Sequence, residues 1–251
     1  MRVVFLAADD EFAGAMQKAL YDRYAEWIVG SVISTVAIYK KNALEAGLFV
    51  VKHSGVRYMA AMIRMKILRK LVRARKTVVP SHLAVDHNVP IHRSKNINSQ
   101  ESLEQLAAWH PDIIISTNFC HYIGKKARES ANLGTWNLHK SYLPHYRGMA
   151  PSFFALLEGA EYSGATLHVV AKGFDTGDII AQVKVPISKE DTVYSLNRRS
   201  SIEGGRMLAK LADETGFVNV RTAPQSEGDW PQHTYPNRDE VRLFRKGRHK
   251  F

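Results

Sequence analysis

Residues 99–117, SQESLEQLAAWHPDIIIST, contain a helix signal and a strand signal separated by one proline. Ser99 is a residue type that caps helix N-termini, and Leu103 and Leu106 follow it at helical spacing. The proline ends that pattern, and the apolar run over residues 112–117 is typical of a strand buried on both faces. The stretch therefore predicts a helix that leads directly into a buried strand.

The alternation of strands and helices continues along the rest of the chain. Residues 3–7 predict a buried first strand, and residues 10–24 predict a helix with an acidic start, which the helix dipole favours. Further strands are expected over residues 27–35, 165–171 and 179–185, and a further helix over residues 192–211. Such alternation predicts an α/β fold, with a mostly parallel sheet and helices on both faces.

Two segments depart from this alternation. Residues 40–76 contain two helical patterns, and residues 216–251 are rich in proline, glycine and charge. The sequence therefore predicts one domain over residues 1–215 that carries a helical insertion at about residues 40–76. A short C-terminal extension over residues 216–251 is expected to lack regular structure.

Positive charge is concentrated in one part of the chain. The formal net charge is +11, and residues 46–85 contain nine Lys and Arg but no Asp or Glu. In the second helical pattern apolar side chains recur every three or four residues, and cations occupy the other sides of the helix. The apolar set is Met59, Met62, Ile63, Ile67 and Leu71, and the cations are Arg57, Arg64, Lys66, Arg69, Lys70 and Arg73.

Three interpretations of this basic helix stay open. In the first, the helix packs on the core and its cations are only solvated. In the second, it lies on an anionic membrane surface. In the third, which is the least favoured, it contacts nucleic acid.

Features that would direct the chain to another compartment are absent from the sequence pattern. No run is apolar and long enough to span a membrane, and the first residues do not resemble a signal peptide. Cys120 is the single cysteine, which excludes an internal disulfide. We therefore expect a cytoplasmic protein, peripheral at the inner face of the membrane if the basic helix binds lipid. No pattern indicates an oligomeric state.

Residues 137–148, NLHKSYLPHYRG, place polar side chains where an expected strand ends. Side chains alternate between the two faces of a strand, so Asn137, His139 and Ser141 are expected to share one face. Strand ends are where open α/β sheets bind ligands. An amide and an imidazole are thus predicted at a ligand site.

A second polar cluster follows in residues 164–180, GATLHVVAKGFDTGDII. Gly173 and Gly177 bracket Asp175, which predicts a tight turn that carries a carboxylate. Such a carboxylate can lie beside a histidine from another strand, where it raises the imidazole pKa or accepts its proton.

The two stretches together resemble the formyltransferases that use 10-formyltetrahydrofolate, namely glycinamide ribonucleotide transformylase, methionyl-tRNA formyltransferase and the sugar N-formyltransferases. Their pattern is N-x-H-x-S-x-L-P-x-x-R-G, then a T-x-H strand, then D-x-G, and every one of these letters is present between residues 137 and 177. The resemblance is specific over residues 112–182. It implies a Rossmann-like formyltransferase fold, 10-formyltetrahydrofolate as the formyl donor, and a primary amine as the acceptor.

The resemblance implies roles for particular residues. Asn137 would polarise the formyl oxygen and stabilise the oxyanion, His139 would transfer a proton, and Asp175 would tune His139 and take part in the proton transfer. The supporting residues would be Thr166, Ser141 and Arg147. His145 and His168 are expected to stay outside the chemistry, His168 being packed beside its strand, and no metal site is expected.

The resemblance also implies that the folate lies between two segments of the chain. One segment would contribute Phe119, His121, Tyr122 and Ile123, with backbone groups that read the pterin ring, and the other would contribute Lys172, Gly173 and Phe174. Cys120 would line the same pocket as a small apolar side chain.

Two departures from the family pattern bear on the acceptor. The first strand–helix turn reads AADDEF over residues 7–12, without the glycine usual for phosphate recognition, and about 40 residues follow residue 211, too few for the β-barrel of methionyl-tRNA formyltransferase. We therefore expect a small-molecule, nucleotide-sugar or lipid-linked amine as the acceptor. Formylation of an aminoacyl-tRNA, and a non-catalytic folate-binding or nucleic-acid-binding module on the same fold, are the alternatives.

Overall fold

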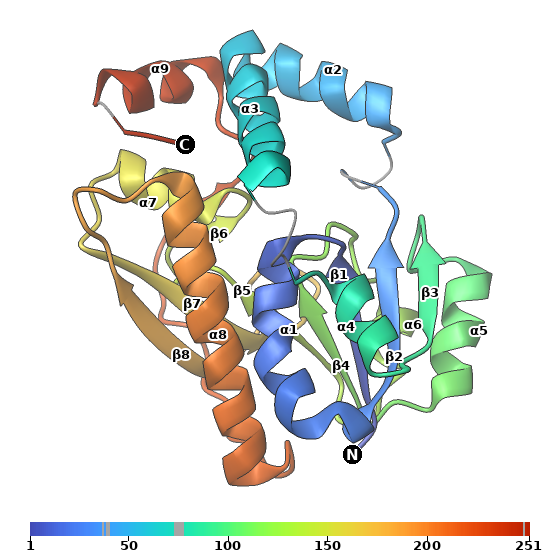
Figure 1. The fold of residues 1–251 in the computed structure, drawn as a ribbon. Helices are drawn as coiled ribbons and strands as arrows, with labels where there is room; N and C mark the ends of the chain where they lie inside the picture. Colours follow the sequence, from blue (N-terminus) through green and yellow to red (C-terminus); the bar gives the residue numbers. More distant parts are fainter. Residues whose placement is uncertain (37, 39–40, 73–77, 248) are drawn as a thin grey trace.

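A sheet of seven strands, in the order β3–β2–β1–β4–β5–β7–β8, runs through the centre of the molecule (Figure 1). In that order the strands span Ile91–Ser94, Ile28–Ser34, Val3–Ala8, Ile113–Thr117, Thr135–His139, Tyr162–Val169 and Ile179–Pro186. The first five are parallel, β7 pairs antiparallel with β5, and β8 pairs antiparallel with β7, so β8 runs in the same direction as the first five. The predicted mostly parallel sheet is confirmed. The computed structural model describes residues 1–36, 38, 41–72, 78–247 and 249–251, and only the backbone of residues 65, 66 and 68–72.

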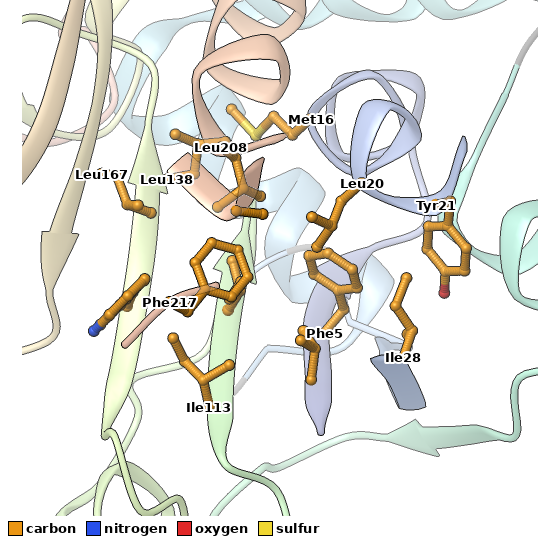
Figure 2. Close-up of a cluster of buried hydrophobic side chains, with 14 of the residues drawn as sticks. Phe5, Met16, Leu20, Tyr21, Ile28, Ile113, Leu138, Leu167, Leu208 and Phe217 are labelled. Atoms are coloured by element: carbon orange, nitrogen blue, oxygen red, sulfur yellow. The ribbon is translucent and has the colours of Figure 1, made fainter. Parts of the chain in front are cut away.

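Helices cover both faces of this sheet, as predicted (Figure 1). One face carries α1 (Glu11–Tyr24), α4 (Pro80–Asp86) and α8 (Val193–Thr215), and the other carries α5 (Gln100–Trp109) and α6 (Lys125–Arg128). Strand side chains alternate accordingly, because Phe5 points into the core under α1 while Val4 points into the core under α5. In Figure 2, Met16 and Leu20 of α1 and Leu208 of α8 lie together in the first of these cores.

Local sequence signals explain where the helices start. The side chain of Asp10 accepts hydrogen bonds from the amides of Phe12 and Ala13, and Ser99 accepts one from the amide of Ser102. These bonds satisfy N–H groups that have no partner inside the helix. The predicted Ser99 cap is therefore confirmed.

A third layer of helices lies beyond the carboxyl ends of the parallel strands (Figure 1). It consists of α2 (Ala43–Ser54), α3 (Val56–Val72), α7 (Pro151–Leu157) and α9 (Arg238–Lys246). Its core is largely aromatic, with Tyr58, Phe153 and Phe244 buried together. Short segments complete the structure, namely the 3-10 turn Ala25–Trp27 and the paired strands β6 (Arg147–Gly148) and β9 (Gln232–His233). Among the described residues, no helix is long and apolar enough to cross a bilayer.

The two predicted helices of the basic segment are confirmed, but the predicted apolar stripe is wrong in part. Met59 and Met62 pack against the third core, whereas Ile63 and Ile67 are exposed. Tyr58, which the pattern did not single out, is the buried anchor of α3. The side chains of Lys66, Arg69, Lys70 and Leu71, and all of Arg73, lie outside the described residues.

The expectation that residues 216–251 lack regular structure is wrong for residues 238–246, which form α9. Asn237 caps this helix in a reciprocal capping box with Glu240, and Val241 and Phe244 turn one face inward. Only two apolar residues, three positions apart, mark this face. Among the many charged residues of the segment, these two were too few to indicate a helix.

Removal of the Phe244 ring tests whether the extension is part of the core. Phe244 is fully buried, and its ring lies 4.4 Å from that of Phe153. Phe244→Ala should reduce the free energy of unfolding by about 3–5 kcal/mol, because it leaves a cavity. Leu243→Ala changes the neighbouring exposed residue of the same helix and should cost less than about 0.5 kcal/mol. Chemical denaturation measures both, and equal losses would contradict the docking of α9.

Candidate active site

Three residues that the sequence patterns single out meet where β5 ends. Asn137 and His139 lie on β5, and Asp175 lies in the loop of residues 170–178 between β7 and β8. Asn137 Nδ2 donates to Asp175 Oδ1 at 3.3 Å, and His139 Nδ1 lies 3.6 Å from Asp175 Oδ2. One carboxylate therefore contacts both the amide and the imidazole.

His168 belongs to the same cluster, so the prediction that it merely packs beside its strand is wrong. It lies directly opposite Asn137 in the β5–β7 pairing, and its Nε2 is 3.1 Å from Asn137 Nδ2 and 3.4 Å from Asp175 Oδ1. Its Nδ1 lies 2.9 Å from the Val169 carbonyl oxygen. A carbonyl only accepts, so Nδ1 carries the hydrogen and Nε2 is free to accept from Asn137.

The carboxylate of Asp175 is nearly buried, with 15% of its side chain exposed. Burial opposes its ionisation, but it is outweighed by the attraction of the imidazoles of His139 and His168 when they carry a proton, together with a hydrogen bond of 2.8 Å from the Gly148 amide. Together they hold the pKa of Asp175 well below its usual range, so the group is an anion at neutral pH. Its backbone is left-handed, with φ of 52°.

His139 is oriented by the backbone of the loop that follows β5. Its Nε2 lies 3.0 Å from the Tyr146 carbonyl oxygen, so in the neutral ring Nε2 carries the hydrogen and donates it there. Nδ1 is then the nitrogen that can take up a proton, and it faces Asp175. Burial lowers the pKa of His139 below its ordinary value, although the Asp175 carboxylate acts in the opposite direction. The pair is thus a neutral imidazole beside a carboxylate.

The predicted supporting residues Thr166 and Ser141 hold the loop after β5 and do not reach the cluster themselves. Thr166 Oγ1 donates to the Ser141 carbonyl at 2.7 Å and accepts from the Leu143 amide at 3.0 Å. The hydroxyl of Ser141 donates to the His145 carbonyl at 2.8 Å. These bonds fix the loop that presents the Tyr146 carbonyl to His139. His145 is exposed and stays outside the cluster, as predicted.

Gly148 occupies a position that only glycine fits. Its φ is +90°, and a Cβ atom there would lie 2.1 Å from the carbonyl oxygen of His233, the residue with which it pairs between β6 and β9. The amide of Gly148 donates to Asp175. Gly148, the last residue of the R-G motif, therefore sets the distance between β9 of the extension and the cluster around Asp175.

Arg147 acts through a residue of the C-terminal extension. Its Nε and Nη2 both donate to Gln225 Oε1, at 3.0 and 2.6 Å. Gln225 Nε2 in turn donates to the carbonyl oxygens of Asp175 and Gly177, at 2.7 and 2.9 Å. Gln225 thus joins the loop after β5 to the loop of Asp175. No motif marked Gln225, because it lies 50 residues from Asp175 in the sequence.

The two segments expected to hold folate come together at their aromatic residues. The rings of Tyr122 and Phe174 meet edge to face, with centroids 5.9 Å apart, and Phe119 lies against the ring of His121. Phe174 and Lys172 are exposed, so this side of the contact is accessible. Gly173 lies close to Thr176, where a Cβ atom would be 2.6 Å from Oγ1.

Within the first of these segments, His121 and Ile123 already have protein partners. His121 Nδ1 accepts from the Ile97 amide at 3.2 Å, and its Nε2 lies 2.9 Å from Ser34 Oγ. Burial lowers the pKa of His121 to about 4, so the ring is neutral. The Ile123 carbonyl accepts from Arg128 at 2.8 Å. The imidazole of His121 therefore helps to fix the shape of the segment.

The acidic turn between β1 and α1 is filled by its own contacts. Asp9 accepts from the amide and hydroxyl of Ser81, and Asp10 accepts from Asn118 Nδ2 at 2.5 Å. Lys140 donates to Asn118 Oδ1 at 2.7 Å. In the part of the chain that the structure describes, no group of three or more His, Cys, Asp and Glu is arranged to hold a metal ion.

The fold is that of solved formyltransferase structures. The N-formyltransferase from Helicobacter canadensis, in complex with folinic acid and dTDP-3-aminofucose, aligns over 94% of this chain and 71% of its own, with a TM-score of 0.63 and 18% identity. Glycinamide ribonucleotide transformylase 1 from Symbiobacterium toebii aligns over 90% of this chain and 95% of its own, with a TM-score of 0.61 and 18% identity. At these identities the likeness concerns the fold alone.

The chain belongs to the formyl transferase family, whose model matches residues 3–211. Among curated relatives, the methionyl-tRNA formyltransferase of Geobacillus sp. (strain WCH70) is 35% identical over 146 residues, which are 58% of this chain and 45% of the relative. The corresponding enzyme of Halalkalibacterium halodurans is 33% identical over 144 residues, 57% of this chain and 45% of the relative. The chain spans about half the length of the curated relatives it matches. The predicted family is confirmed.

The electrostatic coupling between His139 and Asp175 predicts the direction in which the pKa of His139 changes when the carboxylate is removed. The Asp175 carboxylate raises the pKa of His139 against the larger effect of burial. Asp175→Asn should therefore lower the pKa of His139 further below its ordinary value, because the stabilising charge is lost. NMR titration of the histidine ring signals, assigned with His139→Gln, measures this shift. Asp178→Asn alters an exposed carboxylate of the same loop and serves as the control. An unchanged or raised pKa in Asp175→Asn would contradict the coupling.

Proposed function

We propose that this chain transfers the formyl group of 10-formyltetrahydrofolate to a primary amine. The observation that carries the proposal is the convergence of Asn137, His139 and Asp175 on one point at the carboxyl end of β5. Membership of the formyl transferase family supports the reaction class. The folinic acid in the Helicobacter canadensis structure supports a reduced folate as the donor.

Formyl transfer makes three chemical demands on the site. The amine nitrogen forms a bond to the formyl carbon, and the bond from that carbon to the folate nitrogen breaks. Negative charge develops on the formyl oxygen during the attack, the amine loses a proton, and the leaving folate nitrogen gains one. The site must therefore stabilise an oxyanion and move one proton between two nitrogens.

We assign the proton transfer to His139. Nε2 is committed to the Tyr146 carbonyl, so the proton from the amine goes to Nδ1, and the imidazolium that forms faces the Asp175 carboxylate. Asp175 stabilises this charged state without leaving its own anionic state, because its pKa is held well below the usual range. His139 then returns the proton to the leaving nitrogen.

We assign stabilisation of the formyl oxygen to Asn137. Its amide has two N–H bonds, and they face His168 at 3.1 Å and Asp175 at 3.3 Å. To donate to the oxyanion, the amide gives up the longer and weaker contact, to Asp175, while His168 keeps the amide in place. His168 is therefore a positioning residue for Asn137.

We assign the folate ring to the space between the segments of residues 119–123 and 172–174. Tyr122 and Phe174 offer aromatic surface, and the backbone of the first segment offers polar groups, which suits a flat ring with donors and acceptors on its edge. Lys172 is exposed at the rim, where a cation complements a carboxylate on the tail of the donor. Gly173 lets the second segment turn tightly next to Thr176.

Two classes of acceptor are supported by different observations. Asp9 and Asp10 fill the first turn with carboxylates bonded to Ser81 and Asn118, which leaves no room there for an anionic phosphate and favours an amino sugar or a lipid-linked amine. The names of the curated relatives favour the amino group of a methionyl-tRNA. We favour the first class, and the second is the alternative. The intact catalytic set speaks against a non-catalytic module.

Substitution of the catalytic set tests the reaction. His139→Ala and Asp175→Asn should each reduce turnover by about a hundredfold or more, the size expected for the loss of a general acid–base group. His145→Ala, on the same loop but exposed, should leave turnover within about twofold of the unchanged protein. Consumption of 10-formyltetrahydrofolate in the presence of an amine measures the rates. Near-normal turnover in either site variant, with the fold intact, would refute the assignment.

A panel of amines identifies the acceptor. A nucleotide-linked amino sugar, a free amino sugar, an aminophospholipid and methionyl-tRNA are incubated with the protein and 10-formyltetrahydrofolate. We expect one of the sugar or lipid amines to gain the mass of a carbonyl group, and the gain to vanish with His139→Ala. If only the methionyl-tRNA is formylated, the alternative acceptor class is correct. If no amine is formylated although the donor binds, the non-catalytic interpretation replaces the proposed function.

A further inference from the structure

The helix pair α2–α3 exposes a set of aliphatic side chains that the fold does not use. Leu44 and Leu48 on α2 are 72% and 61% exposed, and Val56, Ile63 and Ile67 on α3 are 67%, 50% and 54% exposed. These five make up nearly half of the large apolar residues that the described part of the chain exposes. Single exposed apolar residues are ordinary, but a concentration on one pair of helices marks an interaction surface.

On α3 the exposed aliphatic residues form one narrow stripe. At 100° per residue, Val56, Ala60, Ile63 and Ile67 fall within about 60° of arc. The opposite side of the helix carries Tyr58 and Met62, which pack into the third core. The stripe therefore points away from the protein because the other side is already occupied, so it is not needed to hold the helix in place.

Cations flank the stripe. Arg57 and Arg64 are exposed and lie together, about 90° around α3 from the centre of the stripe, and Lys52 is exposed near the end of α2. Residues 46–85 contain no acidic residue, and Glu45 in the first turn of α2 is the one acidic residue of the two helices, so positive charge predominates on this surface. An aliphatic stripe beside cations is the composition of a helix that lies in the interface of an anionic bilayer.

We propose that the α2–α3 helix pair docks this protein on a membrane surface that contains anionic phospholipid. The aliphatic stripe enters the boundary between headgroups and acyl chains, and the flanking cations bind lipid phosphates. Nucleic acid would be bound by the cations but gains nothing from Leu44, Leu48, Val56, Ile63 and Ile67. A second copy of the chain would bring two surfaces of the same positive charge together, which opposes association.

The docking surface is connected to the catalytic end of the molecule. Tyr58 of α3 packs against Phe153 of α7, with ring centroids 6.3 Å apart, and α7 begins three residues after Gly148. Docking through α2–α3 would thus hold the carboxyl ends of the parallel strands near the lipid surface. The inference stands whether or not the proposed acceptor is correct.

Vesicle flotation tests the proposal without any assay of activity. The full chain is mixed with vesicles of phosphatidylcholine alone or with phosphatidylglycerol, at low and high salt. It should float with the anionic vesicles at low salt, and not with the neutral ones. Each cation removed near the surface should weaken partitioning by roughly fivefold, so Arg57→Gln with Arg64→Gln should weaken it by about 25-fold. Ile63→Ser with Ile67→Ser should also weaken it by tenfold or more, on the order expected for lost apolar burial.

Matched controls separate docking from general charge and hydrophobicity. Lys126→Gln with Arg221→Gln removes two exposed cations elsewhere, and Leu133→Ser with Val218→Ser removes two exposed aliphatic groups elsewhere. Both controls should float like the unchanged protein, and thermal unfolding checks that all variants are folded. The proposal is overturned if the protein does not float. It is also overturned in favour of nucleic acid if only the cation variant loses binding and tRNA competes with the vesicles. It is overturned in favour of self-association if the isoleucine variant instead changes the oligomeric state measured by light scattering.

Discussion

The Asp175 carboxylate is the group on which the arrangement of the site depends. A nearly buried anion needs partners on every side, and here four partners come from three strands: His139 and the Asn137 amide on β5, His168 on β7, and the Gly148 amide on β6. Each partner is fixed in turn by a backbone group or by strand pairing. The loop of residues 170–178 therefore has little freedom, although it lacks regular structure.

The sheet makes this convergence possible at β5, where its strand pairing changes from parallel to antiparallel. β5 is parallel to β4 on one side and antiparallel to β7 on the other. The antiparallel register places His168 opposite Asn137 and Thr166 opposite His139, so one face of two strands supplies both the residues around Asp175 and the residue that holds the loop after β5. Because side chains alternate, a slip by one residue would replace this polar row by Leu138 and Leu167, which belong to the core.

Much of the fold, and of the set of residues that meet around Asp175, could be predicted from the sequence, because those signals are local. The run of isoleucines in β4, the Ser99 cap and the letters N-x-H and D-x-G each lie within a few residues. What was missed depends on contacts between distant segments. His168 joins the cluster only through strand register, and Gln225 through a loop 50 residues away. On α3, the helical spacing of apolar residues does not show which of the two apolar stripes faces the core. That choice depends on the aromatic core against which Tyr58 and Met62 pack.

Gln225 has a consequence for what counts as the functional unit of this chain. It lies beyond residue 211, where the match to the family model ends, yet it ties Arg147 to the carbonyls that flank the aspartate. The segment that carries it is largely exposed, as protease-sensitive segments are. A single cleavage there would leave Asn137, His139 and Asp175 in the polypeptide but would release the Gln225 side chain that joins the loop after β5 to the loop of Asp175. The match to the family model therefore ends, at residue 211, before the segment whose contacts hold the two loops together.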